Sequence, residues 1–152
     1  MFGASSFADV PFGARRQPFV FMAGAATLSV SFEYQIRAAT AEFITSASDT
    51  PASTPFYGSL DQPLSFSRKL SGSDGFGGFL TGQGELSLIN SGGEYDLLPQ
   101  QYALDGRDIE VRYGRITDPY DEWFTIFKGT ASDFRVDEAS VSVALQDYGY
   151  KL

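Results

Sequence analysis

The sequence predicts an all-β fold, an antiparallel β-barrel or β-sandwich with a long extended N-terminal arm and little helix. Three observations carry this prediction. The 152-residue chain contains fourteen Phe, eight Tyr and sixteen Gly, and aromatic residues favour strands whereas glycine favours turns. Several short segments alternate apolar and polar residues, as half-buried strands do. No window shows a sustained helical period, so at most one helical turn is expected, around residues 95–101.

The length predicts a single β domain over residues 19–152, preceded by an extended arm over residues 1–18. A chain of this size forms one domain by the usual prior of about 100–200 residues per domain. In the arm, Phe2, Phe7 and Phe12 are spaced by five residues, which fits neither a helix face nor a strand face. Three phenylalanines are costly to leave in water, so we expect the arm to dock on its own domain or on a neighbour. A disordered tail is the alternative.

The first strand is predicted where apolar and polar residues alternate without interruption. Residues 27–37 have this pattern and predict one half-buried antiparallel strand. Residues 19–23 are expected to pair with it across a turn at Gly24. Residues 40–45 are expected to continue or bend the same strand.

A long loop is predicted next, over residues 46–63. Its prolines cannot donate to a strand ladder, and its Ser, Thr and Asp side chains offer bonds to the local backbone. Residues 64–70 start another strand. Residues 71–84 are rich in glycine, but no helical pattern follows, so a hairpin tip is favoured over a nucleotide-binding turn. The prolines of the loop are Pro51, Pro55 and Pro63.

The segment 84–114 predicts two strands joined by an ordered connection. Short alternating runs open and close the segment, and two glycine-marked turns lie between them. An apolar cluster in the middle suggests that the connection packs on the domain and serves structure or assembly. This cluster consists of Tyr95, Leu97, Leu98, Tyr102 and Leu104.

The C-terminal part predicts a central strand followed by a hairpin. Residues 123–128 carry apolar groups on both faces, which is typical of a central strand. Gly129 is expected to mark a bulge or a turn. In residues 133–145, apolar and polar residues alternate on both sides of a reverse turn at 137–140, which predicts a β-hairpin.

The composition lacks the residues that most often carry out catalysis, so we expect no enzymatic activity, no cofactor and no metal. The chain contains no cysteine and no histidine. This excludes disulfides and thiolate chemistry and removes the commonest general base and zinc ligand. A nucleophilic serine would also lack its usual base. The absence of cysteine suits a chain assembled in a reducing cytoplasm.

The charge distribution argues against nucleic-acid and membrane partners. The net charge is −8, and the acidic excess lies in residues 77–152. No basic stripe is present, so phosphate contacts are not expected. No apolar run reaches the ~18 residues of a membrane span, and no signal peptide is visible.

Acidic residues are the remaining candidates for a metal site or a catalytic site. Asp118, Asp121 and Glu122 could attract calcium, but their spacing does not fit the helix–loop–helix pattern and a solvated turn is favoured. The carboxylate pair of a glycosidase would need two acids that face each other. The strand glutamates are instead expected to point outward; they are Glu33, Glu42, Glu85 and Glu110.

Candidate contact residues are therefore those of an assembly interface. In the turn at Asp105–Arg107, the guanidinium suits a bidentate contact with a carboxylate across a subunit interface. An arginine in solvent beside a turn held by Asp105 is the favoured alternative. The interface candidates are Phe2, Phe7, Phe12, Pro51, Pro55, Phe56, Tyr57, Phe76, Phe79 and Arg107.

The order of motifs over about residues 40–148 resembles a known group of proteins. DTPAST (49–54) and QPLSFSRKL (62–70) precede a glycine-rich tip, and GELSLINSGGEYDLL (84–98), ALDGRDIEVRYG (103–114) and FKGTASDFRVDEASVSVALQD (127–147) follow. This arrangement is similar to tail-tip or baseplate structural proteins of tailed phages and gene-transfer-agent-like particles, in particular the distal-tail and hub components of long-tailed phages.

The resemblance implies a non-enzymatic virion protein that forms a ring, a trimer or a hexamer, at the distal end of the tail tube. Its partners would be itself and neighbouring tube, hub or fibre proteins, with assembly in the bacterial host cytoplasm. One alternative is a carbohydrate-binding β-sandwich that recognises the host surface through Trp123, Tyr57 and Tyr120. A side-fibre adaptor is another.

Overall fold

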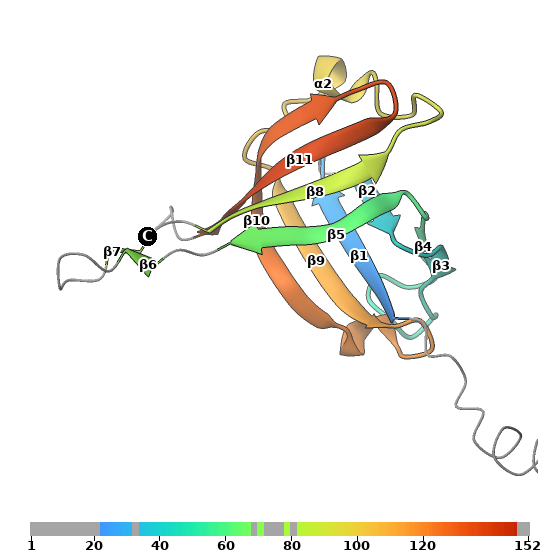
Figure 1. Cartoon of the computed structure of the whole chain (residues 1–152). Helices are drawn as coiled ribbons and strands as arrows, with labels where there is room; N and C mark the ends of the chain where they lie inside the picture. Colours follow the sequence, from blue (N-terminus) through green and yellow to red (C-terminus); the bar gives the residue numbers. More distant parts are fainter. Residues whose placement is uncertain (1–21, 32–33, 68–69, 72–77, 80–81, 149–152) are drawn as a thin grey trace, which may run out of the picture.

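A computed structural model defines the fold for most of the chain (Figure 1). The predicted arm, Phe76 and most of the glycine-rich tip lie outside the described residues. Within the described part, no helix is long and apolar enough to cross a membrane. The described residues are 22–31, 34–67, 70–71, 78–79 and 82–148.

The described residues form a seven-stranded antiparallel sheet with the order β2-β1-β9-β10-β11-β8-β5. This arrangement confirms the predicted all-β class. The strands of this sheet are β1 (Met22–Ser29), β2 (Gln35–Ala39), β5 (Leu60–Ser67), β8 (Gln83–Ile89), β9 (Asp108–Arg115), β10 (Phe124–Val136) and β11 (Ser140–Asp147). The remaining elements are the pair β3 (Phe43–Ile44) and β4 (Pro55–Phe56), the pair β6 (Leu70–Ser71) and β7 (Gly78–Phe79), the turn α2 (Leu98–Gln101) and the 3-10 turn η2 (Tyr120–Glu122).

The sheet curls into a nearly closed barrel. Strand β5 crosses in front of β1 (Figure 1), and Leu60 at its start lies 3.8 Å from the position that a Cβ on Gly24 of β1 would occupy. Every strand of the sheet contributes apolar side chains to one inner core. Its fully buried members include Val30, Leu86, Leu88, Ile109, Val111, Val141, Val143 and Leu145.

The C-terminal hairpin agrees with the sequence prediction. The central strand predicted over 123–128 agrees only in part, because residues 124–128 pair with β9 alone and the pairing with β11 begins at Gly129. Strand β10 pairs with both β9 and β11, and the backbone N–H of Asp137 donates to the Ser140 carbonyl at 2.8 Å in the hairpin turn. The bulges of β10 lie between Thr125 and Phe127 and between Ala131 and Asp133. Gly129 lies between these bulges and is not a turn.

The predicted continuous strand 27–37 is wrong, because the chain reverses inside it. Strands β1 and β2 form a hairpin in which the backbone N–H groups of Val30 and Ser31 each donate to the Tyr34 carbonyl at 3.0 Å. Leu28 and Ile36 are cross-strand partners and share one face, so the alternation continues across the reversal. Gly24 lies in the middle of β1 and is not a turn either.

The long loop predicted over 46–63 is also partly wrong. Residues 43–44 and 55–56 pair as β3 and β4 and do not extend the first strand. Strand β5 already starts at Leu60, and Pro63 lies within it. A proline is tolerated there because β5 is an edge strand and its register shifts between Gln62 and Ser65, and a proline needs a position without a ladder donor.

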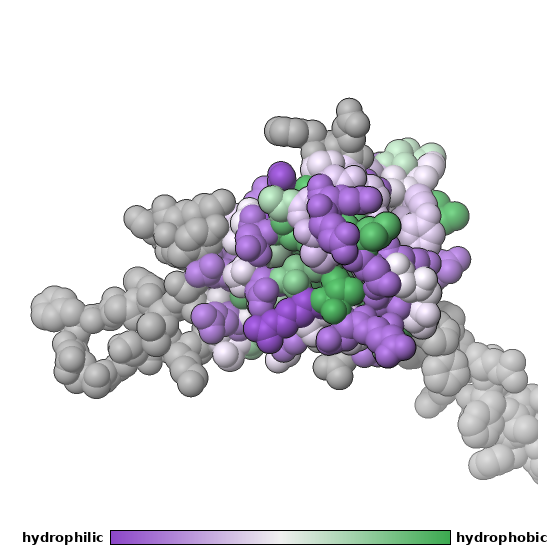
Figure 2. All heavy atoms as spheres, turned by 90° about the horizontal axis from the view of Figure 1, so that it is seen from above, coloured by the Kyte–Doolittle hydropathy of each residue, from purple (hydrophilic) through white to green (hydrophobic). Residues whose placement is uncertain are grey.

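The predicted connection between β8 and β9 closes one end of the barrel. Tyr95, Leu98 and Leu104 are buried in the inner core, and Tyr102 packs against it, as expected. Leu97 is instead 58% exposed. From above this end, small groups of hydrophobic residues lie among mostly hydrophilic ones (Figure 2). The predicted helical turn is present as α2.

Candidate assembly surface

The β3–β4 pair is a flap with one buried and one exposed face. Phe43 and Phe56 are cross-strand partners, as are Ile44 and Pro55. Phe56 is fully buried, whereas Ile44 is 69% exposed. Tyr57, two residues after Pro55 in the chain, is 60% exposed. We call Ile44, Pro55 and Tyr57 the flap face.

The buried face of the flap belongs to a second core on the outside of the barrel. The Phe43 ring centroid lies 4.8 Å from that of Phe56 and 4.9 Å from that of Trp123. Tyr120 completes this outer aromatic cluster. The rings can approach the sheet because small residues occupy its outer surface beneath them, namely Ala23, Ala25, Ala39 and Gly114.

Backbone hydrogen bonds fix the flap to the edge of the sheet. The N–H of Ala39 donates to the Tyr57 carbonyl at 2.7 Å, and the N–H of Tyr57 donates to the Arg37 carbonyl at 3.1 Å. These bonds occupy the outer edge of β2 beside Tyr57. The Tyr57 ring is therefore exposed while its backbone is held in place.

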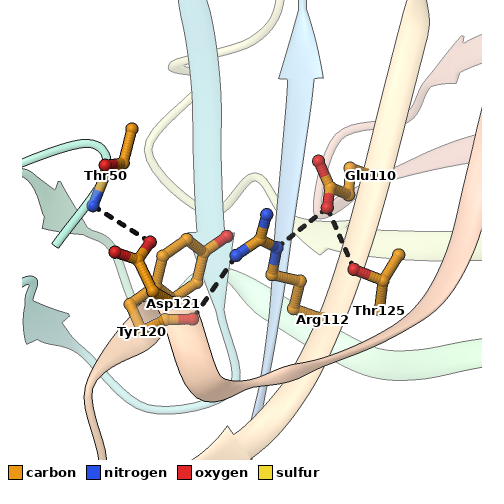
Figure 3. Close-up of polar contacts among 6 residues, drawn as sticks. All are labelled: Thr50, Glu110, Arg112, Tyr120, Asp121 and Thr125. Carbon is orange, nitrogen blue, oxygen red and sulfur yellow. Dashed lines mark hydrogen bonds and ion pairs between the residues drawn. The ribbon is translucent and has the colours of Figure 1, made fainter.

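The loop from Thr45 to Thr54 is ordered by side-chain bonds. Thr45 Oγ1 accepts from the N–H of Thr54 at 2.8 Å and donates to the Pro51 carbonyl at 2.6 Å. Asp49 is buried and accepts from the N–H of Ser46 at 2.7 Å. Asp121 of η2 accepts from the N–H of Thr50 at 3.1 Å (Figure 3). The predicted irregular loop thus has a defined shape.

Several polar side chains, among them Arg112, Glu110 and Thr125, border the outer aromatic cluster (Figure 3). Arg112 Nε donates to Glu110 Oε1 at 2.8 Å, and the guanidinium carbon lies 4.8 Å from the centre of the Tyr120 ring. Burial alone would raise the pKa of Glu110, but the hydrogen bond and charge of Arg112, with a bond from Thr125 and the charge of Lys128, lower it below its ordinary value. Burial raises the pKa of Tyr120. Both shifts move the pKa away from neutral pH, whereas a general acid or base works best with a pKa near the working pH.

The structure places the predicted interface residues in different environments. Pro55 and Tyr57 are exposed and lie together, whereas Pro51 is half-buried in the loop. Phe56 is wrong as an interface residue, because it is fully buried in its own domain. Phe79 lies in β7, where only the backbone is described. Phe2, Phe7, Phe12 and Phe76 lie outside the described residues.

Arg107 is neither free in solvent nor paired with a carboxylate in the described residues. Its Nε donates to the Ala103 carbonyl at 2.9 Å, and the residue is half-buried. Gly106 before it has a φ of 76°, a backbone conformation that favours glycine. Arg107 therefore supports its own turn, and its role at an interface stays a prediction.

Two of the three aromatic residues considered for sugar stacking are buried. Trp123 and Tyr120 are each 5% exposed and pack in the outer aromatic cluster. Only Tyr57 presents its ring to solvent. Among the described residues, no group of three or more acidic side chains is placed to hold a metal ion. Glu42 and Glu85 are exposed as expected, Glu110 is half-buried, and Glu33 lies outside the described residues.

Ile44 is a candidate contact residue that the sequence reasoning missed. The signal was present in the segment 40–45, where Phe43 and Ile44 are adjacent apolar residues. Adjacent residues of a strand point to opposite faces. If one is buried, the other is therefore exposed unless a further layer covers it.

Comparisons with known proteins identify the fold. A scan against protein-family models and a search of curated proteins returned no match. The structure is similar to a chain in the virion of a native gene transfer agent particle, with a TM-score of 0.62 and 13% sequence identity. The similarity covers 89% of this chain and 43% of the other, so this chain spans less than half of its neighbour's length.

Proposed function

We propose that this chain is a non-enzymatic structural component of a phage-like virion. The observation that carries the proposal is the shared fold with a chain of a gene transfer agent virion over 89% of this chain. The motif order over residues 40–148, which resembles tail-tip proteins, points the same way. A virion protein acts through surfaces that fix its neighbours, and the flap is such a surface.

Within the virion, we propose a place in the tail tip or baseplate. Copies of the chain would form a trimeric or hexameric ring at the distal end of the tail tube and link it to hub and fibre proteins. In a ring, each copy meets the next through the same pair of surfaces, so one modest apolar face is used repeatedly.

The flap face is suited to such a contact because it is apolar, exposed and already ordered. Burying apolar surface contributes roughly 25 cal/mol per Å², and association loses less free energy when the contacting groups are held beforehand. Ile44 lies on a strand whose other face is anchored in the outer aromatic cluster, and the Tyr57 backbone is bonded to β2. The flap face therefore loses little conformational entropy when it forms the contact.

Self-assembly can be tested on the purified chain by light scattering over a range of concentrations, with electron microscopy of the particles formed. The wild-type chain should form rings, and the double variant Ile44→Ser/Tyr57→Ser should shift toward the monomer. Leu97→Ser is a matched control, since Leu97 is a similarly exposed apolar residue at the α2 end. A wild-type chain that stays monomeric throughout would contradict the ring, and a flap variant that assembles normally would contradict the flap contact.

The virion role itself is tested in particles. Particles isolated from producing cells should contain the chain in a fixed stoichiometry, as measured by mass spectrometry of purified fractions. Antibody labelling should then mark one end of the tail. If the chain is absent from intact particles, the virion role is wrong, whatever the purified protein does alone.

A further inference from the structure

The inner face of the sheet is uncovered at one end of the barrel. There the start of β1, the end of β9 and the start of β10 lie below the crossing of β5 (Figure 1). The connection that contains α2 closes the opposite end. Three large side chains at the open end are exposed: Met22 at 44%, Tyr113 at 40% and Phe124 at 77%.

The strand register shows that these side chains belong to the inner face. Tyr113 is the cross-strand partner of both Gly24 and Phe124, and partners share a face of the sheet. Val111, two residues earlier in β9, lies in the inner core at 1% exposure. Met22 lies two residues before Gly24 and so has the same phase. These residues are positioned as core residues but keep 40% to 77% of their surface exposed in the described structure.

The cover from β5 stops just before this point. Phe66 of β5 packs edge-to-face on Phe127, with 5.2 Å between ring centroids, and Phe127 is buried. Phe124 lies beyond the bulge of β10. Next to it, Phe66, Ile126 and Phe127 line a shallow hollow of about 590 Å³ together with Thr125 and Lys128. We call Met22, Tyr113 and Phe124 the open inner face, and the exposed bulge residue Ile126 lies at its border.

We propose that residues 1–21 of the same chain cover the open inner face. This segment joins the domain at Met22, which is itself part of the face. It contains the phenylalanines Phe2, Phe7, Phe12, Phe19 and Phe21. The segment therefore carries the type of side chain that an apolar face with aromatic residues binds.

The reach and the linkage of the segment favour it over a second copy of the chain. Strand β10 lies two strand spacings from β1, roughly 10 Å away, whereas ten extended residues span up to about 33 Å. Phe12 and the residues before it can therefore reach Phe124. A covalently joined segment binds at an effective concentration on the order of millimolar, which a separate copy does not match. The inference does not depend on the virion role.

Spin labelling tests the inference in the full chain, which has no cysteine of its own. In the variant Ala14→Cys, a nitroxide attached to the new thiol will weaken nearby backbone amide signals in an NMR spectrum. We expect the signals of Tyr113, Phe124 and Ile126 to lose most of their intensity. The signals of Leu97 and Tyr57, which are exposed elsewhere, should not change.

A mixed sample separates the same chain from a neighbour. In this sample, ¹⁵N-enriched protein without a spin label is mixed with spin-labelled protein at natural isotope abundance. The amide signals of Tyr113, Phe124 and Ile126 should then keep their full intensity. A loss in the mixed sample would show that a second copy covers the face. Equal losses over the whole domain, or none at the open inner face, would also overturn the proposal.

Two sets of substitutions test the contact itself in the spin-labelled chain. Phe7→Ser/Phe12→Ser and, separately, Phe124→Ser should each restore the intensities at Tyr113 and Ile126. Leu97→Ser is the control and should leave the losses unchanged. The amide spectrum of each variant also shows whether the barrel is folded, which is expected because Phe124 is mostly exposed. Persistent losses in both test variants would contradict docking through these side chains.

Discussion

At the scale of single residues, the outer aromatic cluster depends on the absence of side chains beneath it. A Cβ on Gly114 would lie 2.4 Å from Trp123 Cγ, closer than any two such carbon atoms can approach. Gly114 and Ala23 are cross-strand partners, so the indole lies over two small residues.

Gly114→Ala should therefore destabilise the fold by about 1–3 kcal/mol, the usual range for an overpacked site. Urea unfolding measures this effect, and Trp123 is the sole tryptophan of the chain, so its fluorescence reports on the site directly. Gly58→Ala is the control, because a Cβ there would meet Glu42 N at an ordinary 3.5 Å. If the two variants unfold at the same urea concentration, the packing argument fails.

At the scale of elements, a buried polar side chain helps to hold the connection between β8 and β9. Asn90 is 1% exposed. Its Nδ2 donates to Asp96 Oδ1 at 2.7 Å, and its Oδ1 accepts from the N–H of Tyr95 at 3.0 Å. The backbone N–H of Asn90 donates to the Ala139 carbonyl in the β10–β11 turn at 2.9 Å. Asn90 thus joins the connection to a turn distant in sequence.

Asn90→Ala should lower the free energy of unfolding by about 2–3 kcal/mol, because a buried N–H on Tyr95 loses its acceptor. Amide hydrogen exchange should show faster exchange through the connection than in the strands. Gln100→Ala, at an exposed position of α2, should change stability by less than about 0.5 kcal/mol. Uniform exchange rates in Asn90→Ala would show that the connection does not depend on this residue.

Alternation and turn residues were enough to predict several elements. The β10–β11 hairpin and the packed connection both follow from local patterns. The β1–β2 reversal was missed because cross-strand partners keep the same phase across a short turn. The flap was missed because its strands are two residues long and its folding depends on the outer aromatic cluster, which is a tertiary contact.

The candidate contact residues were predictable only in part, for a related physical reason. The sequence shows that Phe56 and Tyr57 are both aromatic, but burial is decided by which of two adjacent side chains meets the barrel. The structure buries Phe56 and exposes Tyr57. The sequence likewise leaves two interpretations for Trp123, and its packing over Gly114 assigns it to the outer aromatic cluster. Composition can predict the type of contact, and only tertiary structure assigns it to residues.

At the scale of the whole molecule, the sheet separates two cores that contain one buried tyrosine each. Tyr95 closes the inner core at the α2 end, and Tyr120 lies in the outer aromatic cluster. Burial raises the pKa of both hydroxyls, although the hydrogen bond between Ser59 and Tyr95 and the one between Thr27 and Tyr120 lower it in part. The folded state therefore holds both protons more tightly than the unfolded chain does.

This difference predicts a fall in stability at alkaline pH. Below the ordinary tyrosine pKa of 10.0 the contribution of both residues is fully present. Above it the unfolded chain loses protons that the folded chain retains, so the free energy of unfolding falls as pH rises toward the folded pKa values. Urea unfolding at a series of pH values should show this fall, and the double variant Tyr95→Phe/Tyr120→Phe should show a shallower one.

The same double variant must also be compared with the wild type at neutral pH. The double variant lacks the hydrogen bonds of the two hydroxyls at every pH, which lowers its free energy of unfolding without any ionisation. The alkaline effect is the additional pH dependence beyond that constant difference. Because the two tyrosines lie in separate cores, each single variant should remove its own share, and the shares should add. An unchanged alkaline slope in the double variant would mean that other groups cause the loss.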